Sequence, residues 1–268
     1  AYNAESKVVE SMRPNGVLIA QISPQGGRIS GTSSIVQLDA WNWEDAAIKT
    51  NDGIHLNWPN SFSRGRWWLG ESRGYKQNPK YNSDIEKLSD YFKESVAYLS
   101  SNKETINLAY ESMNGLFDNS QTLFIHVDDE KGIVDAVNFS KNFNIKNTVI
   151  IGGYQAHLIS DFLVQNNIPV LIQHTHSLPN FEDEDYNSTY LNPKKLIDAG
   201  LSFLWTCNVE SKWGHIIQGQ EMKEPSSISA LENPMVLIAV SGPQDQLDLE
   251  RQLKAQGLEK GISYYFFC

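Results

Sequence analysis

The stretch SPQGGRISGTSSIVQLDAWNWEDA, residues 23–46, is the most informative part of this chain for its fold. It follows directly on the apolar run Gly16–Ile22, within which Val17–Ile22 is predicted to be a strand. Glycines let the backbone approach a ligand closely, and hydroxyl and carboxylate groups can converge there. A strand that leads into a long polar loop is also how α/β barrels build their active faces. We therefore expect residues 23–46 to form a loop beside a binding site.

The composition is that of a globular protein with a buried core. The chain has 268 residues, of which 40% are hydrophobic and 20% are charged, enough for one large domain or two modest ones. The net charge of −10 argues against a nucleic-acid partner, because phosphate binding needs clustered Lys and Arg. No apolar run approaches the roughly 18 residues that a membrane helix needs. We expect a small-molecule substrate, with no nucleic-acid and no membrane partner.

The cysteines are Cys207 and Cys268. They have no metal-ligand spacing and build no disulfide framework, so reduced thiols are expected and a single bridge is the alternative.

Strand-like and helix-like patterns alternate along the chain. After Val17–Ile22, the predicted strands are Leu123–Val127, Thr148–Ile151, Pro169–Ile172 and Leu201–Trp205. The predicted helices are Ser83–Ser100 with Ser83 as its cap, Lys131–Asn142, Gln155–Gln165 and Pro193–Ala199 closed by Gly200, and residues 101–116 also look helical. Such alternation with short connections is typical of an α/β fold, in which helices cover a parallel sheet.

The character of the chain changes after about Trp205. A polar stretch is followed by predicted strands at Met235–Val240 and Ile262–Phe267, with a helix over Gln244–Gln256 between them. This part resembles the small Rossmann-like module found beside some glycosyltransferases and sugar-modifying enzymes. We therefore predict two domains, one over residues 1–205 and a small α/β module over residues 206–268.

Residues 1 to about 203 resemble a second family. The matching blocks are NGV at 15–17, GGRISGTSS at 26–34, VQLDAWNWED at 36–45, IHLNWP at 54–59, IHV at 125–127, GGY at 152–154, HSLP at 176–179 and DAG at 198–200. They are similar to the secreted bacterial, imidazolonepropionase-like branch of the amidohydrolase superfamily. The resemblance implies a (β/α) barrel that hydrolyses a C–N bond in an amide or cyclic amide. A divalent metal would activate the water and polarise the carbonyl.

Three features of that family's metal site have no match in this chain. The family's His-x-His pair lies upstream of the matching region, and its closing Asp lies beyond about Gly200, where this chain becomes the C-terminal module. Gly152-Gly153 stands where many amidohydrolases carry a sixth-strand histidine. The expected fold class is therefore α/β, a partial (β/α) TIM-barrel-like parallel sheet followed by a small C-terminal α/β module.

His126 is the first candidate metal ligand, because it ends the predicted strand Leu123–Val127 at the edge where barrels place catalytic residues. The resemblance puts it at the family's fifth-strand metal histidine. His176 is the second candidate. Strand alternation places it on one face with His174, and His176 is the one that matches the family. Zinc is the expected cofactor, since it accepts imidazole ligands. The alternatives are a histidine bonded to a neighbouring loop and a substrate-facing or structural His176.

The opening segment supplies the candidate substrate-binding groups. Hydroxyl groups, backbone N–H groups and one guanidinium can form an anion- or carbonyl-binding loop. The candidates are Arg28, Thr32, Ser33, Ser34 and Asp39, together with His55 from the strand-like IHLNW. The alternative is structural: Trp41 and Trp43 pack, and the nearby carboxylates cap a helix or pair with Arg.

Three functions follow from these patterns. The first is metal-dependent hydrolysis of a C–N bond. The second is a non-catalytic, amidohydrolase-like remnant or binding scaffold, and the third is a nucleotide-sugar-linked accessory role for residues 206–268. An open parallel sheet exposes edge strands, so a homodimer or an edge covered by the C-terminal module is expected. The resemblance also implies a periplasmic or secreted location.

Overall fold

The computed structural model describes residues 2–64, 75–101, 105–173, 175, 177–181 and 184–201, and the backbone of residues 203–205, 236–239 and 264–267. The chain divides into two compact units. One contains residues 1–21, 35–48 and 209–268, and the other contains residues 22–34 and 49–208. The boundary expected between residues 205 and 206 stays a prediction. No helix among the described residues is long and apolar enough to cross a membrane.

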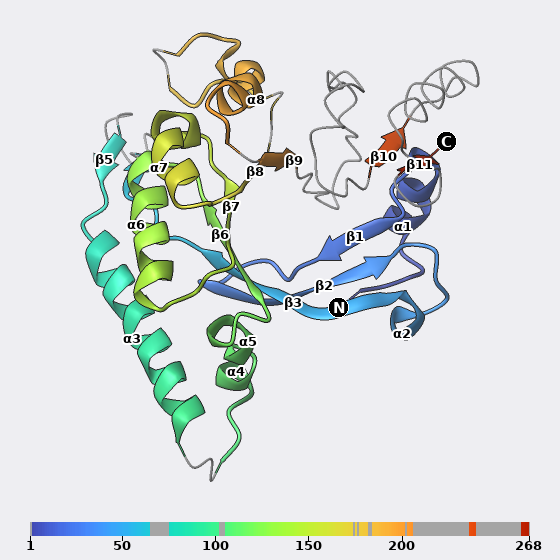
Figure 1. Ribbon diagram of the computed structural model, residues 1–268, viewed down its shortest axis with the longest axis horizontal. Helices are drawn as coiled ribbons and strands as arrows, with labels where there is room; N and C mark the ends of the chain where they lie inside the picture. Colours follow the sequence, from blue (N-terminus) through green and yellow to red (C-terminus); the bar gives the residue numbers. More distant parts are fainter. Residues whose placement is uncertain are drawn as a thin grey trace. The chain divides into compact units, whose positions relative to one another are not determined.

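The main sheet has the strand order β1-β2-β3-β6-β7-β8-β9. Its strands are β1 Ile19–Ile22, β2 Ile29–Gln37, β3 Ala47–Asn57, β6 Thr122–Val127, β7 Thr148–Gly152, β8 Val170–Ile172 and β9 Phe203–Trp205. From β3 to β9 each neighbouring pair is parallel. Between these strands come helices, which makes the curled parallel sheet of a partial (β/α) barrel (Figure 1). The predicted α/β fold is confirmed at this level.

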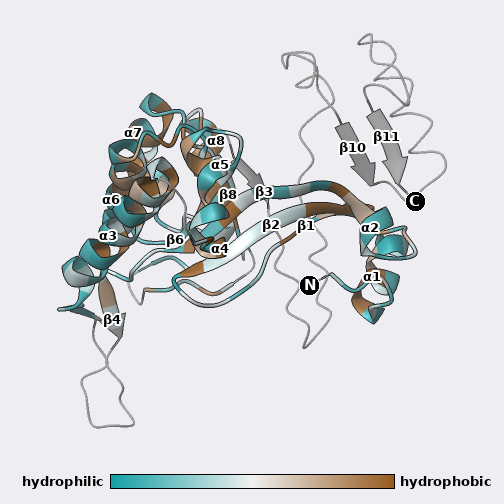
Figure 2. Cartoon of the chain, turned by 90° about the horizontal axis from the view of Figure 1, so that it is seen from below, coloured by the Kyte–Doolittle hydropathy of each residue, from teal (hydrophilic) through white to brown (hydrophobic). Residues whose placement is uncertain are grey.

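The helices of the larger unit follow the strands in turn. They are α3 Tyr81–Ser100, α4 Leu108–Glu111, α5 Asn114–Phe117, α6 Glu130–Asn142, η3 Ala156–Ile159, α7 Ser160–Gln165 and α8 Ser188–Asp198. A short antiparallel pair, β4 Phe62–Arg64 and β5 Tyr75–Gln77, precedes α3. Polar and apolar residues are mixed around α3 and α6, as expected of helices with one buried face (Figure 2).

The core of this unit lies between the sheet and the helices α3 and α6, which run side by side (Figure 1). Phe92 of α3 is fully buried, and its ring meets that of Phe139 of α6 at a centroid distance of 4.9 Å. The strands contribute every second residue to this core: Ile54, Leu56, Leu123, Ile125 and Val127. Such alternation is the period-2 pattern of a strand with one face on the core.

Several predicted boundaries were wrong. Helix α3 begins at Tyr81 with Lys80 at its N-cap and no side-chain cap, so Ser83 is not the cap. Helix α8 begins at Ser188 and includes Pro193, since a proline inside a helix can be tolerated at the loss of one backbone bond. The single helix expected over residues 101–116 is instead the short α4 and α5, where Asn107 caps α4.

The predicted loop over residues 23–46 is also wrong in its second part. Residues 29–37 form β2, because Ile29, Thr32, Ile35 and Val36 are β-branched residues that favour strands. Ser33 is fully buried in this strand, and its hydroxyl donates to the Gly53 carbonyl 3.2 Å away. Small hydroxyl residues such as Ser33 are common in loops, but here they allow β2 and β3 to pack closely.

The smaller unit holds α1 Lys7–Met12, η1 Arg13–Asn15 and α2 Trp43–Ala46. Asn42 caps α2 by accepting from the Asp45 amide. Two further strands, β10 Val236–Ala239 and β11 Tyr264–Phe267, pair in parallel where strands were predicted. The helix expected between them, Gln244–Gln256, lies outside the described residues, and the Rossmann-like resemblance stays a prediction.

Candidate functional site

The face of the sheet opposite to the α3–α6 core carries two histidines. On β3 and β6 the residues that alternate with the core positions are His55, Asn57, Phe124 and His126. In the parallel register of the two strands, His55 is opposite Phe124, and Asn57 is opposite His126. His55 and His126 are thus diagonal neighbours on this face.

The two imidazoles contact each other. Nδ1 of His55 lies 2.9 Å from Nε2 of His126, which is hydrogen-bond distance. The His55 ring also stacks on Phe124, with centroids 4.8 Å apart and planes at 17°. His55 is only 3% exposed, and its Nε2 is buried without a hydrogen-bond partner. Its position is therefore fixed by the His126 contact and by the aromatic stack.

Burial keeps both rings neutral near pH 7. Desolvation, together with the nearby His126, lowers the pKa of His55 from 6.5 to about 4, and Asp52 opposes this shift only in part. Desolvation also lowers the pKa of His126. In a neutral pair one ring donates and the other accepts, so the tautomer of each ring depends on that of the other. When His126 donates from Nε2, its Nδ1 is an acceptor.

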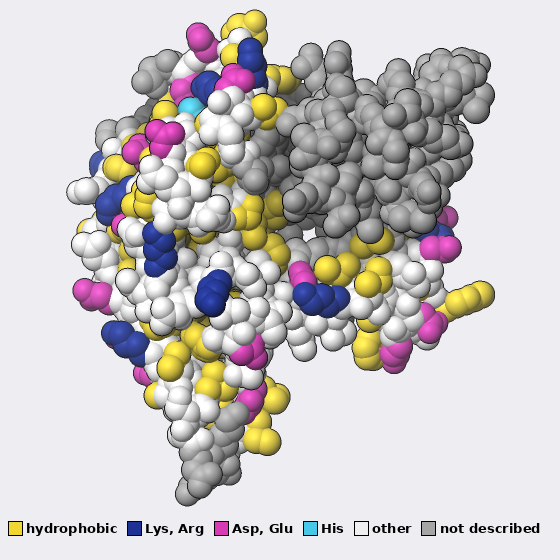
Figure 3. All heavy atoms as spheres, in the orientation of Figure 1, with side chains coloured by type: hydrophobic (Ala, Val, Ile, Leu, Met, Phe, Trp, Pro, Cys, Tyr) yellow, Lys and Arg dark blue, Asp and Glu magenta, His cyan; other side chains and the backbone are white. Residues whose placement is uncertain are grey.

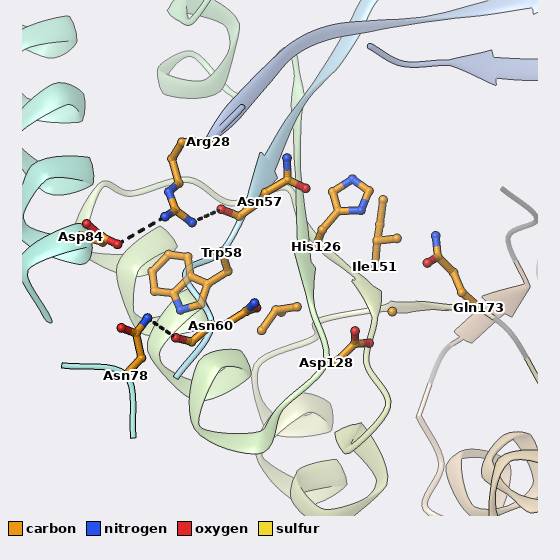
Figure 4. Close-up of a pocket in the computed structure, with 12 residues that line it drawn as sticks. Arg28, Asn57, Trp58, Asn60, Asn78, Asp84, His126, Asp128, Ile151 and Gln173 are labelled. Atoms are coloured by element: carbon orange, nitrogen blue, oxygen red, sulfur yellow. Dashed lines mark hydrogen bonds and ion pairs between the residues drawn. The ribbon is translucent and has the colours of Figure 1, made fainter. Parts of the chain in front are cut away.

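A cavity of about 530 Å³ opens where the parallel strands β3, β6, β7 and β8 end. Figure 4 shows how its side chains converge from separate elements. The lining is mostly polar and rich in amides: Arg28, Asn57, Trp58, Asn60, Asn78, Asp84, His126, Val127, Asp128, Ile151, Gly152 and Gln173. We call it the carboxyl-edge pocket. Ligands of parallel α/β sheets generally bind at this edge.

One wall of the pocket is a hydrogen-bonded frame around Arg28 (Figure 4). Its guanidinium donates to the Asn57 carbonyl at 2.9 Å and lies 3.6 Å from the Asp84 carboxylate of α3. The Asn57 amide in turn donates to the Gly27 carbonyl at 2.8 Å and the Ser30 hydroxyl at 3.0 Å. These contacts attach the 26–30 segment to the end of β3.

Behind that wall, Trp58 is held by a buried polar chain. Its indole N–H donates to the Tyr81 hydroxyl at 3.1 Å, and Tyr81 donates to Asp135 of α6 at 2.7 Å. The indole N–H and the Tyr81 hydroxyl both have partners, so the chain fixes the Trp58 ring at the pocket without the cost of a lost hydrogen bond.

Asp128 lies at the end of β6 beside the glycine pair that follows β7. Gly152 has φ +97°, and a Cβ placed there would lie 2.5 Å from Asp128 Oδ1. The Tyr154 amide donates to the same oxygen at 3.4 Å. Only glycine satisfies both the backbone angle and the close approach. Gly152, which stands where the resemblance led us to expect a histidine, thus makes room for the Asp128 carboxylate.

The candidate residues from the sequence separate into groups. Arg28 and His126 line the pocket, and His55 supports His126 from the sheet face. Ser33 is buried in β2, where Thr32 and Ser34 are half-buried and do not line the pocket. Asp39 forms an ion pair with Arg13 at 2.6 Å. His176 lies outside the described residues, as does His174. Their substrate and metal roles remain predictions.

Sequence reasoning missed several residues of the pocket. Asn57 is the last residue of the strand that carries His55, Trp58 follows it, and Asp128 follows His126 by two residues. Position at a strand end was the signal that could have found these three. Asn78, in contrast, lies between β5 and α3, and Asp84 lies in the first turn of α3, so both are brought here only by tertiary packing.

The described residues do not fit a catalytic metal ion by themselves. No group of three or more His, Cys, Asp or Glu residues in the described ranges could hold one. Nε2 of His126, a nitrogen that a metal could use, is already occupied by His55. Catalytic zinc sites generally use three protein ligands, so we derive no chemical step from a metal.

No family model and no curated protein matches the chain. Among solved structures, it is similar to an amidohydrolase from Thermotoga maritima MSB8, with a TM-score of 0.61 and 18% sequence identity. The similarity covers 77% of this chain and 55% of that protein, so the chain spans about half of its relative's length. At this identity the likeness concerns the fold, which is amidohydrolase-like.

Proposed function

We propose that the chain is an amidohydrolase-type hydrolase that cleaves a C–N bond of an amide or cyclic amide in the carboxyl-edge pocket. The observation that carries this proposal is the His55–His126 pair, a partly buried imidazole contact of 2.9 Å in which His126 lines a polar pocket at the strand ends. A carboxylate, Asp128, lines the same pocket. These are the residue types that move protons in hydrolysis.

His126 is the proposed proton carrier. With its Nε2–H donated to His55, its Nδ1 accepts a proton from a water molecule, and the oxygen of that water forms a bond to the carbonyl carbon. The proton then passes from Nδ1 to the leaving nitrogen as the C–N bond breaks. This role requires the tautomer in which His55 Nδ1 accepts from His126 Nε2–H and His126 Nδ1 is an acceptor. The role of His55 is positioning, because it is buried behind His126.

The amide side chains of the pocket are proposed to orient the substrate. Asn57, Asn60, Asn78 and Gln173 offer both donors and acceptors without net charge. An amide or cyclic amide carries both kinds of group as well. The Arg28 guanidinium already donates to the Asn57 carbonyl and pairs with Asp84. Its proposed role is therefore to form the pocket wall that faces the carbonyl group of the substrate.

The expected zinc at His126 and His176 remains a separate proposal. Its test is metal analysis of the purified chain after loading with zinc or manganese. Binding near one metal per chain, lost in His126→Ala, would support it. Less than about 0.1 metal per chain would exclude metal-assisted hydrolysis of the kind that needs a bound ion.

A second candidate function is a non-catalytic binding scaffold. It is favoured by the absence of a three-ligand group among the described residues and by Gly152 in place of a histidine. One assay separates the two functions: release of amine or carboxylate from a panel of hydantoins, dihydropyrimidinones, imidazolones and N-acyl amino acids. Turnover of any of these, lost in His126→Ala, supports the hydrolase, and no turnover by the metal-loaded chain supports the scaffold.

A further inference from the structure

A second cavity adjoins the carboxyl-edge pocket beside the N-terminal half of α3. Its volume is about 410 Å³, within the range of small-molecule sites. We call it the α3 groove, and its lining residues are Arg28, Ile29, Asp84, Lys87, Leu88 and Tyr91. Arg28 and Asp84 also line the carboxyl-edge pocket, so the two cavities meet at this ion pair.

The wall of the α3 groove is apolar and is held in place by the core. Leu88 is only 4% exposed and belongs to the core, against which the half-buried Ile29 and Tyr91 pack. The Tyr91 ring also contacts the Tyr110 ring, with centroids 5.2 Å apart. An apolar group of a ligand therefore meets a preformed surface here, and covering that surface removes apolar area from water.

The two cavities differ in their balance of charge. In the α3 groove two accessible cations share one carboxylate: Asp84 lies 3.6 Å from Arg28 and 3.5 Å from Lys87, whose side chains are 41% and 75% exposed. The carboxyl-edge pocket has the opposite balance, since Asp84 and Asp128 line it together with Arg28. The excess of cations is local, because over α3 and α6 Figure 3 shows basic and acidic side chains interspersed. An anionic group is thus favoured in the α3 groove over the carboxyl-edge pocket.

The α3 groove lies within reach of His126. Asn57 and His126 are register partners on neighbouring strands, and such strands lie about 4.8 Å apart. Nη1 of Arg28 donates to the Asn57 carbonyl, and Figure 4 shows Arg28, Asn57 and His126 in a row with Asp84 beyond Arg28. A ligand arm of a few carbon atoms therefore spans the step from His126 to the groove.

We propose that the substrate has an apolar arm that bears a carboxylate, and that this arm occupies the α3 groove while the amide lies beside His126. The apolar part of the arm lies on the apolar wall, and its carboxylate pairs with Lys87 and Arg28. The proposal rests on the hydrolase function proposed above, and it narrows the substrates to amides with one apolar, anionic arm.

Isothermal titration of the full chain with three probes tests the proposal. N-acetyl-L-leucine has both the apolar group and the carboxylate, N-acetyl-L-leucinamide lacks the charge, and N-acetylglycine lacks the apolar group. We expect N-acetyl-L-leucine to bind about tenfold more tightly than either of the others. The titrations are run on the wild-type chain and on His126→Ala, so that binding is measured apart from hydrolysis.

A pair of lysine variants locates the binding site. Lys87→Gln should weaken N-acetyl-L-leucine by about threefold, the size expected for an exposed ion pair, and leave N-acetyl-L-leucinamide unchanged. Lys93→Gln is the matched control. Lys93 lies on the same helix and pairs with Asp90 at 3.0 Å, as Lys87 pairs with Asp84, but it does not line the α3 groove.

The proposal is overturned if N-acetyl-L-leucine does not bind, or if either of the other probes binds as tightly. Equal effects of Lys87→Gln and Lys93→Gln would also overturn it. If Lys87→Gln does not fold, the comparison of the three probes on the wild-type chain decides alone.

Release of the amino acid by the wild-type chain separates this proposal from the hydrolase function. Preferential binding of N-acetyl-L-leucine without release of leucine would sink the hydrolase and leave the α3 groove as a binding site. Release of leucine and glycine from the two N-acetyl amino acids with equal kcat/KM would sink the groove and leave the hydrolase.

Discussion

Nδ1 of His55 and Nε2 of His126 lie 2.9 Å apart although 71 residues separate them in the sequence. The parallel pairing of β3 with β6 brings them together. Because His55 is buried, His126 is partly buried and both rings are neutral, each determines the tautomer of the other. The proposed chemistry of the carboxyl-edge pocket depends on this contact, and the first prediction concerns its electrostatics.

The His55 pKa predicts a loss of stability in mild acid. The ring titrates at about 4 in the folded chain and near 6.5 when exposed. Between these values the unfolded state binds more protons, so the free energy of unfolding should fall as the pH drops from about 6.5 to about 4. Above 6.5 this group contributes no pH dependence. Urea unfolding at several pH values measures the effect.

The matched variant for this prediction is His55→Phe, which keeps a ring on Phe124 and cannot be protonated. Its unfolding free energy should fall less between pH 6.5 and pH 4 than that of the wild-type chain. Parallel curves for the two proteins would contradict a buried neutral His55.

Gly152→Ala should destabilise the chain and displace Asp128. The new Cβ would lie 2.5 Å from Asp128 Oδ1 and would also sit at φ +97°. Gly26→Ala is the control, because Gly26 also has a positive φ of +88°, but a Cβ at this position would have no atom within 4 Å. Both variants carry backbone strain of about 1–3 kcal/mol, so the additional loss of unfolding free energy in Gly152→Ala reports the Asp128 contact. Equal losses would show that Asp128 moves away freely.

Tyr81→Phe should cost about 1–3 kcal/mol of unfolding free energy, because it leaves the buried Trp58 indole N–H without an acceptor. The control is Tyr110→Phe. The Tyr110 hydroxyl bonds Glu94 at 2.9 Å on the exposed side of α3, so its loss should change stability by less than about 0.5 kcal/mol. Near-ultraviolet circular dichroism should show a changed Trp signal in Tyr81→Phe and not in Tyr110→Phe. A Tyr81→Phe protein as stable as the wild type would mean that water replaces the hydroxyl.

Much of the fold could be predicted because the strands obey simple periodicity. Leu123, Ile125 and Val127 alternate with Phe124 and His126, which indicates a strand whose two faces differ. The predicted bounds of β6, α6 and β7 lie within one residue of the observed bounds. Boundaries failed where local signals conflicted, as in β2, whose Gly31 and hydroxyl residues resemble a loop although its β-branched residues favour a strand.

The site was less predictable because its residues come from distant segments. His126 was identified by its place at a strand end, but its contact with His55 requires the register between β3 and β6. That register follows from tertiary packing across β4, β5 and α3 to α5, and no local pattern encodes it. Asp84 reaches the pocket from a helix, so its role depends on where α3 packs. His176, the second of the two predicted metal ligands, lies outside the described residues.

The most direct test of the account is hydrolysis by His126→Ala with and without added imidazole, on any amide that the wild-type chain cleaves. General acid–base catalysis typically contributes about 10²–10⁴-fold, so kcat/KM should fall by at least about 100-fold while the melting temperature stays close to that of the wild type. Added imidazole should restore part of the lost rate by replacing the missing ring. A variant that keeps wild-type kcat/KM would contradict the central role of His126.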